Sequence, residues 1–403
     1  MSSTRPFLLL LLTAWIVGLT GASPASQLGP TLSQVYDTTD KLPLANLGNL
    51  QVHDPNIVYW DAHYYLFKGG HHVPFFKAAN ISGPWTQVGT VLDGDSVIHQ
   101  GNRSRPWAPT TIERNGTFYC FYTLSTHGSR NSAIGVATTT TLDGSPWTDH
   151  GAVIRTGQGN GSDVWPFTIT NAIDASFITD QSTGQAYLNF GSFWHDIWQV
   201  PLTDDLLAIK DPDNPDAVQL TFIPHQRVRP EEGSWMSYHD GYYYVWFSHG
   251  RCCRFDTAGF PARRDEYSIR VGRSRDVRGP FVDQDGKELV EGGGTVVYGS
   301  NHGQIYAPGG LGVLAGNDST PDILYYHYLN TSIGFLDDDA QLGWNFLKYD
   351  DGWPVALEGE NIEHAEAEAK TENKASHNGG SILSLQRWIY WTVVMCSWLY
   401  IWS

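Results

Sequence analysis

Three carboxylates stand in comparable settings along this chain of 403 residues. Asp54 lies between a His and a Pro, Asp174 ends the run Asn-Ala-Ile-Asp, and Glu232 begins the run Glu-Gly-Ser. Each precedes, by 11 to 13 residues, a tyrosine in an aromatic-rich segment. Any one of them alone would suit an ordinary turn, but the shared position suggests a shared task.

Two suitably placed carboxyl groups suffice to hydrolyse a glycosidic bond, because one protonates the leaving oxygen while the other activates water or attacks the sugar. A third acid nearby would raise the pKa of the proton donor by repulsion between like charges. Aromatic side chains near the acids could stack on sugar faces, with core packing as their alternative role: Trp107, Trp165, Phe193, Trp194 and Trp235.

The elements that must position these acids form a repeat of a polar turn followed by an aromatic-rich strand. Its five marker tyrosines are spaced by 54, 68, 56 and 82 residues: Tyr65, Tyr119, Tyr187, Tyr243 and Tyr325. Each copy has the aromatic and branched residues of a strand, bounded by Gly, Asp or Asn. Five copies predict an all-β, five-bladed β-propeller, with a pair of β-sandwiches as the alternative. In a propeller, residues from different blades meet at the central axis.

The composition fits an all-β extracellular protein. Only 17% of residues are charged and 13% are aromatic, and 42 Gly and 21 Pro indicate many turns. The formal net charge of −17 argues against nucleic acid or an anionic polymer as the main partner, because phosphate contacts need Lys and Arg. A sugar-binding module remains compatible with this composition.

The beginning of the chain has the features of a cleaved secretory signal over residues 1–22. A basic residue, an apolar run and small residues follow in that order. A lead-in over 23–47 then precedes the catalytic propeller, which we expect over 48–357. Six acceptor sequons support passage through the secretory pathway: Asn80, Asn102, Asn115, Asn160, Asn317 and Asn330.

The end of the chain predicts a glycosylphosphatidylinositol (GPI) anchor. An acidic linker over 358–380 leads to small residues, a short spacer and an apolar tail within 381–403, a segment removed when the lipid is attached. We expect attachment at Asn378 or Gly379, on the extracellular face of the plasma membrane. The alternatives are a membrane helix in the tail, an aberrant end of the gene model, and plain secretion.

Four cysteines are too few for a disulfide-stapled scaffold, and no His/Cys spacing matches a zinc site. Cys396 leaves with the tail if the anchor forms. Cys252 and Cys253 either bond to each other, or one of them pairs with Cys120.

Several segments together resemble glycoside hydrolase family 43, and within it the endo-α-1,5-L-arabinanases. The resemblance spans about residues 48–357 and depends on the order and spacing of these pieces: His53-Asp54-Pro55, Trp107-Ala108-Pro109, Asn171-Ala172-Ile173-Asp174, Gly191-Ser192-Phe193-Trp194, Glu232-Gly233-Ser234, Cys252-Cys253, Val271-Gly272-Arg273-Ser274, Gly279-Pro280-Phe281 and Gly292-Gly293-Gly294-Thr295.

The resemblance implies a five-bladed propeller and an inverting mechanism. Asp54 would be the general base that activates water, and Glu232 the general acid. Asp174 would adjust the pKa of Glu232 and orient the substrate. We prefer Glu232 to its neighbour Glu231 because Glu-Gly-Ser is the tripeptide of the family, and adjacent strand residues point in opposite directions.

The chain departs from the family pattern at three places. Thr110 stands where Asp is frequent, and Ala175 stands where Pro is usual. The segment Ala307-Pro308-Gly309-Gly310 lacks the His with which many members hold a metal in the channel. His302 is our candidate for that role, with His327 or no residue as alternatives. The chemistry itself requires no cofactor, so the metal would be structural.

These observations favour a monomeric endo-acting hydrolase of arabinan that touches the membrane only through its lipid and binds no nucleic acid. An exo-acting α-L-arabinofuranosidase or β-xylosidase of the same family is the nearest alternative. A catalytically inactive sugar-binding propeller and a structural wall protein are the others, although neither needs three equivalent acids.

Overall fold

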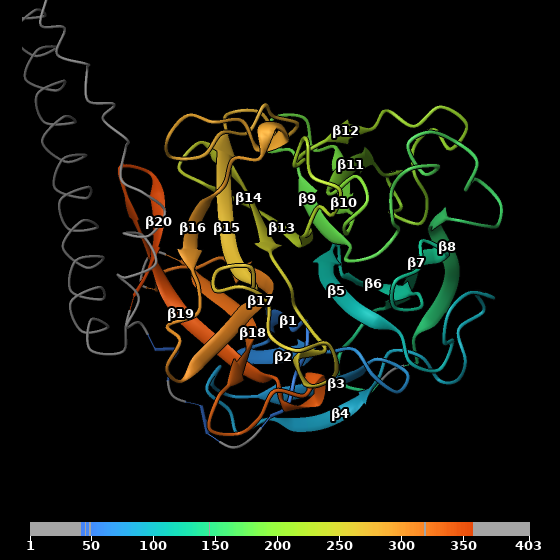
Figure 1. The fold of residues 1–403 in the computed structure, drawn as a ribbon. Helices are drawn as coiled ribbons and strands as arrows, with labels where there is room; N and C mark the ends of the chain where they lie inside the picture. The colour runs from blue at the N-terminus through green and yellow to red at the C-terminus, as the bar shows by residue number, and fades with distance from the viewer. Residues whose placement is uncertain (1–41, 45, 48–49, 145, 318–319, 358–403) are drawn as a thin grey trace, which may run out of the picture.

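The computed structural model describes residues 42–44, 46–47, 50–144, 146–317 and 320–357. Within them, twenty strands form five four-stranded antiparallel sheets arranged as a ring (Figure 1). The predicted all-β five-bladed propeller is therefore confirmed. The predicted signal peptide and anchor signal lie outside the described residues.

Each blade is built from four consecutive strands, so the chain completes one blade before it begins the next. The first comprises β1 (Asn56–Trp60), β2 (His63–Phe67), β3 (Pro74–Ala78) and β4 (Thr86–Thr90); the second β5 (Trp107–Arg114), β6 (Thr117–Leu124), β7 (Ser132–Thr139) and β8 (Thr148–Thr156); the third β9 (Ser176–Thr179), β10 (Ala186–Phe190), β11 (Trp198–Pro201) and β12 (Val218–Gln219). The fourth comprises β13 (Glu231–His239), β14 (Tyr242–His249), β15 (Ser268–Ser274) and β16 (Thr295–Tyr298), and the fifth β17 (Ile305–Leu314), β18 (Ile323–Asn330), β19 (Gln341–Asp350) and β20 (Trp353–Ala356).

Helical structure within the described ranges is limited to single turns in the connections between strands. These are α2 (Phe255–Ala258) and the 3-10 turns η1 (Leu289–Glu291) and η2 (Asp337–Asp339). None of the helices in this part of the chain has the length and hydrophobicity required to cross a membrane.

The repeated aromatic segments are the second strands of the blades. The five marker tyrosines lie on β2, β6, β10, β14 and β18. These strands are central in their sheets and covered by neighbouring blades on both faces, so they read as continuous apolar runs rather than as alternating patterns. In β14, for example, the six residues between the two ends of the strand are all buried.

The hydrophobic core consists of clusters that lie between adjacent blades. Phe67 of the first blade packs with Phe118 of the second, and equivalent clusters join the second to the third, the third to the fourth and the fourth to the fifth. A further cluster, which includes Ile57 and Tyr325, joins the fifth blade back to the first. The lead-in strengthens this closure, since the N–H of Leu44 donates to the carbonyl of Trp344 at 2.9 Å.

The innermost strands β1, β5, β9, β13 and β17 share an unusual backbone conformation near the point where each begins. One residue in each blade has a positive φ of 36–58°: Asp54, Ala108, Asp174, Gly233 and Gly310. Left-handed conformations are costly for residues other than glycine and are concentrated at functional sites. Because this left-handed conformation recurs in all five blades, it indicates a functional site at one end of the axis.

The sequons lie where glycans could be accommodated. Asn80, Asn102, Asn115, Asn160 and Asn317 are exposed, and Asn330 is half-buried. Glycosylation itself stays a prediction.

Candidate active site

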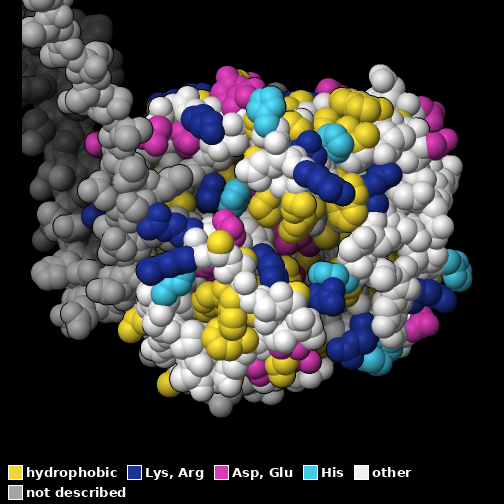
Figure 2. All heavy atoms as spheres, in the orientation of Figure 1, with side chains coloured by type: hydrophobic (Ala, Val, Ile, Leu, Met, Phe, Trp, Pro, Cys, Tyr) yellow, Lys and Arg dark blue, Asp and Glu magenta, His cyan; other side chains and the backbone are white. Residues whose placement is uncertain are grey.

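The three predicted acids converge at one end of the axis. A cavity of about 30 Å³ on the axis is lined by the left-handed residue of every blade, including Asp54 and Asp174. The N–H of Gly233, next to Glu232, donates to Asp174 Oδ2 at 3.2 Å. Figure 2 shows acidic side chains recessed near the middle of this face, with Lys and Arg side chains around them. The predicted convergence is therefore observed, while the catalytic roles remain predictions.

Asp54 is held as a carboxylate by imidazoles. Its Oδ2 lies 3.1 Å from His53 Nδ1, and its Oδ1 lies 3.3 Å from His327 Nδ1. Burial raises the pKa of Asp54, but the charge of His53 and the hydrogen bonds with His327 and His53 together outweigh burial and hold the pKa well below its ordinary value. Burial and the neighbouring His53 lower the pKa of His327 to about 4, so the N–H of Asp54 donates to its neutral Nδ1 at 3.1 Å. An ionised carboxylate is what a general base requires.

Glu232 has the opposite environment. It is 8% exposed, and this burial raises its pKa above the ordinary value. Ser192 Oγ donates to its Oε2 at 2.5 Å, and the Tyr267 hydroxyl donates to its Oε1. These two donors limit the rise in pKa and fix the orientation of the carboxyl group. A carboxyl group that keeps its proton is suited to be a general acid.

Asp174 is influenced by both of the other acids. Burial raises its pKa well above the ordinary value, and the charges of Glu232 and Asp54 add to the rise. Its own N–H donates to Thr123 Oγ1 at 3.2 Å. Asp174 is therefore coupled electrostatically to both other acids, as the predicted role in adjusting the pKa of Glu232 requires.

Glu231 lies on the opposite face of β13, as alternation along a strand requires. It is fully buried, with Oε1 3.4 Å from His249 Nδ1. Burial raises its pKa to about 7, and burial with the charge of Glu231 raises the pKa of Asp196 to about 8. Glu231 and Asp196 are therefore buried in the interior of the fold.

The five aromatic residues divide between the surface and the core. Trp165 is 54% exposed and packs edge-on against Trp198, whereas Trp107, Phe193 and Trp194 are half-buried. Trp235 packs against the core cluster between the fourth and fifth blades and lines the axial cavity. Their predicted stacking on sugar stays untested.

The structure corrects the prediction for the metal ligand. His302 Nε2 lies 3.3 Å from Glu266 Oε1 and does not belong to the group of described residues that could hold a metal. That group is His53, Asp54 and His327, whose ligand atoms lie within 4.8 Å of one another. The Nε2 of buried His327 has no hydrogen-bond partner among the described residues.

The missing histidine of the family is explained by the position of His327. A Cβ at Gly310 would lie 2.0 Å from Asp54 Oδ1 and 2.6 Å from His327 Nδ1. A side chain at position 310 therefore has no room while His327 reaches the axis from β18. Thr110 and Ala175, the other two positions at which the chain departs from the family pattern, contact each other. Thr110 Oγ1 donates to the carbonyl of Ala175 at 2.6 Å.

Sequence reasoning did not assign roles to Ser192, Tyr267 or His53. Ser192 and His53 lie in the family-like segments, so their proximity to the acids was a usable signal. Tyr267 is one of 20 tyrosines, and its local sequence does not distinguish it. Its contact depends on Gly309, where a Cβ would lie 2.1 Å from the Tyr267 ring.

The cysteine alternatives are also resolved. Cys252 and Cys253 are bonded to each other, and Cys120 is free and buried.

Comparison with known proteins identifies the family. The model of glycosyl hydrolases family 43 matches residues 47–354. The chain belongs to glycosyl hydrolase family 43. The probable arabinan endo-1,5-alpha-L-arabinosidase D of Emericella nidulans is 54% identical over 352 residues, covering 87% of this chain and 90% of that protein.

Solved arabinanases share the fold. The Cellvibrio cellulosa alpha-L-arabinanase complexed with arabinohexaose matches with a TM-score of 0.67 and 25% identity, covering 77% of this chain and 96% of that one. An exo-1,5-alpha-L-arabinanase from a bovine ruminal metagenomic library matches with a TM-score of 0.65 and 28% identity, covering 78% and 99%. The fold alone therefore does not separate endo from exo action.

Removing the hydroxyl of Tyr267 tests its role in this family 43 site. Because that hydroxyl donates to Glu232, Tyr267→Phe should raise the pKa of Glu232 and move the alkaline limb of the pH–rate profile up by about one pH unit. We also expect kcat to fall by about tenfold, since the carboxyl group loses an orienting contact. Tyr65→Phe, whose hydroxyl bonds remote Asp143, is the matched control. An unmoved limb would show that Tyr267 does not influence Glu232.

Neutralising Glu231 tests its position in the interior. A carboxyl group whose pKa is raised to about 7 binds more protons in the folded than in the unfolded state, so it destabilises the fold as pH rises from about 4.5 to 7. Glu231→Gln should recover on the order of 2 kcal/mol at pH 8 relative to the wild-type chain, with little gain at pH 4.5. Denaturant unfolding at both pH values measures this, with exposed Glu288→Gln as control.

The activity of Glu231→Gln is a separate test. Loss of turnover equal to that of Glu232→Gln would mean that the general acid is Glu231.

Proposed function

We propose that this family 43 enzyme hydrolyses internal α-1,5-L-arabinofuranosidic bonds in arabinan, with inversion at the anomeric carbon. The observation that carries the proposal is the contrast between two carboxyl groups at one end of the axis. Histidines lower the pKa of Asp54, while burial raises the pKa of Glu232. Relatives named as arabinan endo-1,5-alpha-L-arabinosidases support the choice of substrate.

The roles of the two acids follow from their environments. Asp54 accepts a proton from a water molecule, which attacks the anomeric carbon from the side opposite the leaving group. Glu232 donates its proton to the departing oxygen as the bond breaks. Asp174 is coupled electrostatically to Glu232, and Ser192 and Tyr267 hold the Glu232 carboxyl group in a single orientation.

Endo action is the part of this proposal that most needs a test. The solved exo-acting relative has the same fold, so an exo-acting arabinofuranosidase or xylosidase is the competing outcome. Purified protein should release a ladder of arabino-oligosaccharides from linear arabinan at early times, and nothing from xylan. Release of monosaccharide alone from the first time point would show exo action, and inertness toward every polymer would indicate a sugar-binding propeller.

Substitution of the acids tests their separate roles. Asp54→Asn and Glu232→Gln should each reduce kcat on arabinan by at least about a thousandfold, because each removes a proton-transfer group. Asp174→Asn should also lose activity and shift the alkaline limb through the pKa of Glu232, because the two carboxyl groups are coupled. An Asp174→Asn profile with an unchanged limb would leave Asp174 only the role of orienting substrate.

The His53, Asp54 and His327 group would hold the structural ion of the channel. A cation there would fix the orientation of the Asp54 carboxylate and the two imidazoles. Proton transfer by Asp54 and Glu232 requires no ion.

We further propose that the enzyme is a monomer on the extracellular face of the plasma membrane, held by a GPI lipid at Asn378 or Gly379. The acidic linker followed by small residues and an apolar tail supports this location. An apolar tail retained on a secreted protein would be an aggregation hazard, and its removal avoids that problem.

Phospholipase treatment tests the anchor. Phosphatidylinositol-specific phospholipase C should release active protein from washed membranes, whereas a matched chain truncated after residue 377 should appear in the medium without treatment. Protein that resists release, or that reaches the medium with its tail intact, would contradict the anchor.

A further inference from the structure

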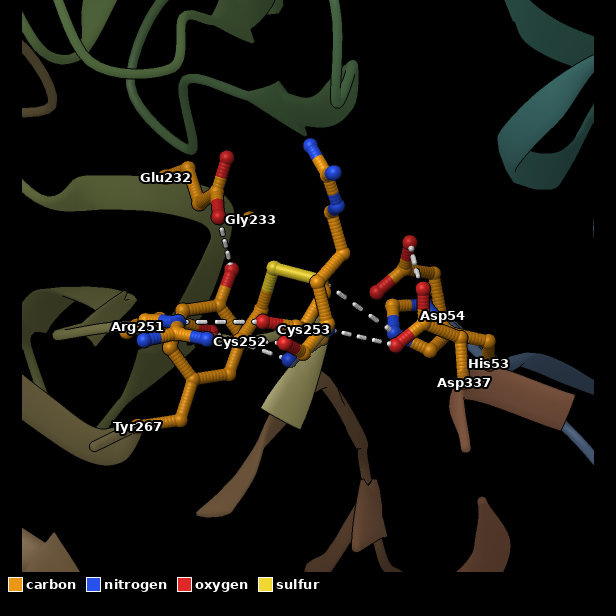
Figure 3. The surroundings of a disulfide bond; sticks show 12 residues. His53, Asp54, Glu232, Gly233, Arg251, Cys252, Cys253, Tyr267 and Asp337 are labelled. Atoms are coloured by element: carbon orange, nitrogen blue, oxygen red, sulfur yellow. Dashed lines mark hydrogen bonds and ion pairs between the residues drawn. A yellow bond between two sulfur atoms is a disulfide. The ribbon is translucent and has the colours of Figure 1, made fainter. Parts of the chain in front are cut away.

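The disulfide between Cys252 and Cys253 lies within the site but has no part in the mechanism above. Figure 3 shows it between the Glu232 and Tyr267 side chains and the His53 and Asp54 side chains. Cys253 Sγ is 3.8 Å from His53 Nε2. The disulfide therefore lies between Tyr267, which contacts the proposed general acid, and His53, which contacts the proposed general base.

The segment that carries the disulfide is fixed on several sides. Arg251 Nε donates to the carbonyl of Cys253 at 3.1 Å, and its Nη2 donates to the carbonyl of Arg254 at 2.8 Å. The N–H of Arg254 donates to Asp337 Oδ1 at 2.9 Å, which joins the segment to the fifth blade. Cys252 packs on the aromatic cluster that includes Tyr267. The two sulfurs are consequently held in place rather than left on a free loop.

The surface of a disulfide differs chemically from its neighbours at this site. Asp54, His53, Glu232 and Tyr267 all offer charge or strong hydrogen bonds, whereas a disulfide offers neither a charge nor an N–H or O–H donor. Both cysteines are only half-buried, so part of this apolar surface is accessible. Pyranose and furanose rings carry apolar C–H faces, and an apolar, rigid surface is their natural complement.

We infer that the Cys252–Cys253 disulfide is a positioning surface on which an arabinofuranose ring rests beside the scissile bond. This inference depends on the proposed function. A scissile bond that reaches both Asp54 and Glu232 must pass close to the disulfide, because the sulfurs lie beside His53 and Tyr267, the partners of these two acids. The contact contributes to substrate binding, because the sulfurs neither donate nor accept a proton in the reaction.

Replacement of both cysteines tests this surface. Cys252→Ala/Cys253→Ala should raise KM for linear arabinan by about tenfold, the effect of losing one apolar contact of this size. The pH dependence of kcat should be unchanged, because the acids keep their partners. Cys120→Ser is the matched control, since it removes a buried free cysteine elsewhere. An unchanged KM in a folded double variant would overturn the inference, as would a shifted pH profile with unchanged KM.

Protection from reduction tests the same surface in the native chain, even if the double variant fails to fold. Dithiothreitol reduces the bond to two thiols and becomes a cyclic disulfide, so electrons and protons balance. In Glu232→Gln, which we expect to turn over substrate very slowly, saturating arabinohexaose should slow this reduction at least about fivefold by covering the sulfurs. Alkylation and mass measurement of the new thiols follow the rate, with xylohexaose as the control sugar.

The binding and reduction measurements together distinguish failure of the disulfide inference from failure of the proposed function. Calorimetric binding of arabinohexaose with an unchanged reduction rate would overturn the inference and leave the proposed function standing. Absence of arabinohexaose binding would overturn the proposed substrate, and the inference with it. Equal protection by both sugars would show a general effect of crowding at the site and would also overturn the inference.

Discussion

The burial of three carboxyl groups at one end of the axis is the constraint on which the rest of the site depends. Carboxylates removed from water are unstable unless they are paired, hydrogen-bonded or protonated. The propeller uses a different solution for each. Asp54 is paired with imidazoles, Glu232 receives two hydroxyl donors, and burial together with the charges of its neighbours raises the pKa of Asp174. The chemical difference between the acids is therefore a product of the environment that makes their burial tolerable.

This constraint also explains the glycines of the fifth blade. Gly309 leaves room for the Tyr267 ring, and Gly310 leaves room for Asp54 and His327. Both positions lie on β17, which is buried except at its last residue. Because the two glycines have no side chains, groups from other strands can reach the acids. The absence of a side chain at position 310 and the position of His327 beside Asp54 are thus parts of one arrangement.

The fold and the three acids were predictable because they depend on local patterns. Aromatic strands such as that around Tyr243 recur once per blade, and the spacing of Asp54 and Asp174 from them is nearly constant. The partners were less accessible, because they depend on contacts between blades. Choosing His327 over His302 requires knowing that β18 brings its ring to Asp54 while His302 faces Glu266. Tyr267 depends in the same way on space left by Gly309 of another blade.

The closure of the ring between the first and fifth blades determines when the site comes into existence. Asp54 belongs to the first part of the propeller to leave the ribosome, whereas Gly310 and His327 belong to the last. The core cluster around Ile57 and Tyr325, which brings these parts together, can form only after the fifth blade has been synthesised. A nascent chain that has completed four blades already contains both proposed catalytic residues but lacks the imidazole that contacts Asp54 from β18. The complete site is therefore a property of the finished polypeptide, and partial translation products do not contain it.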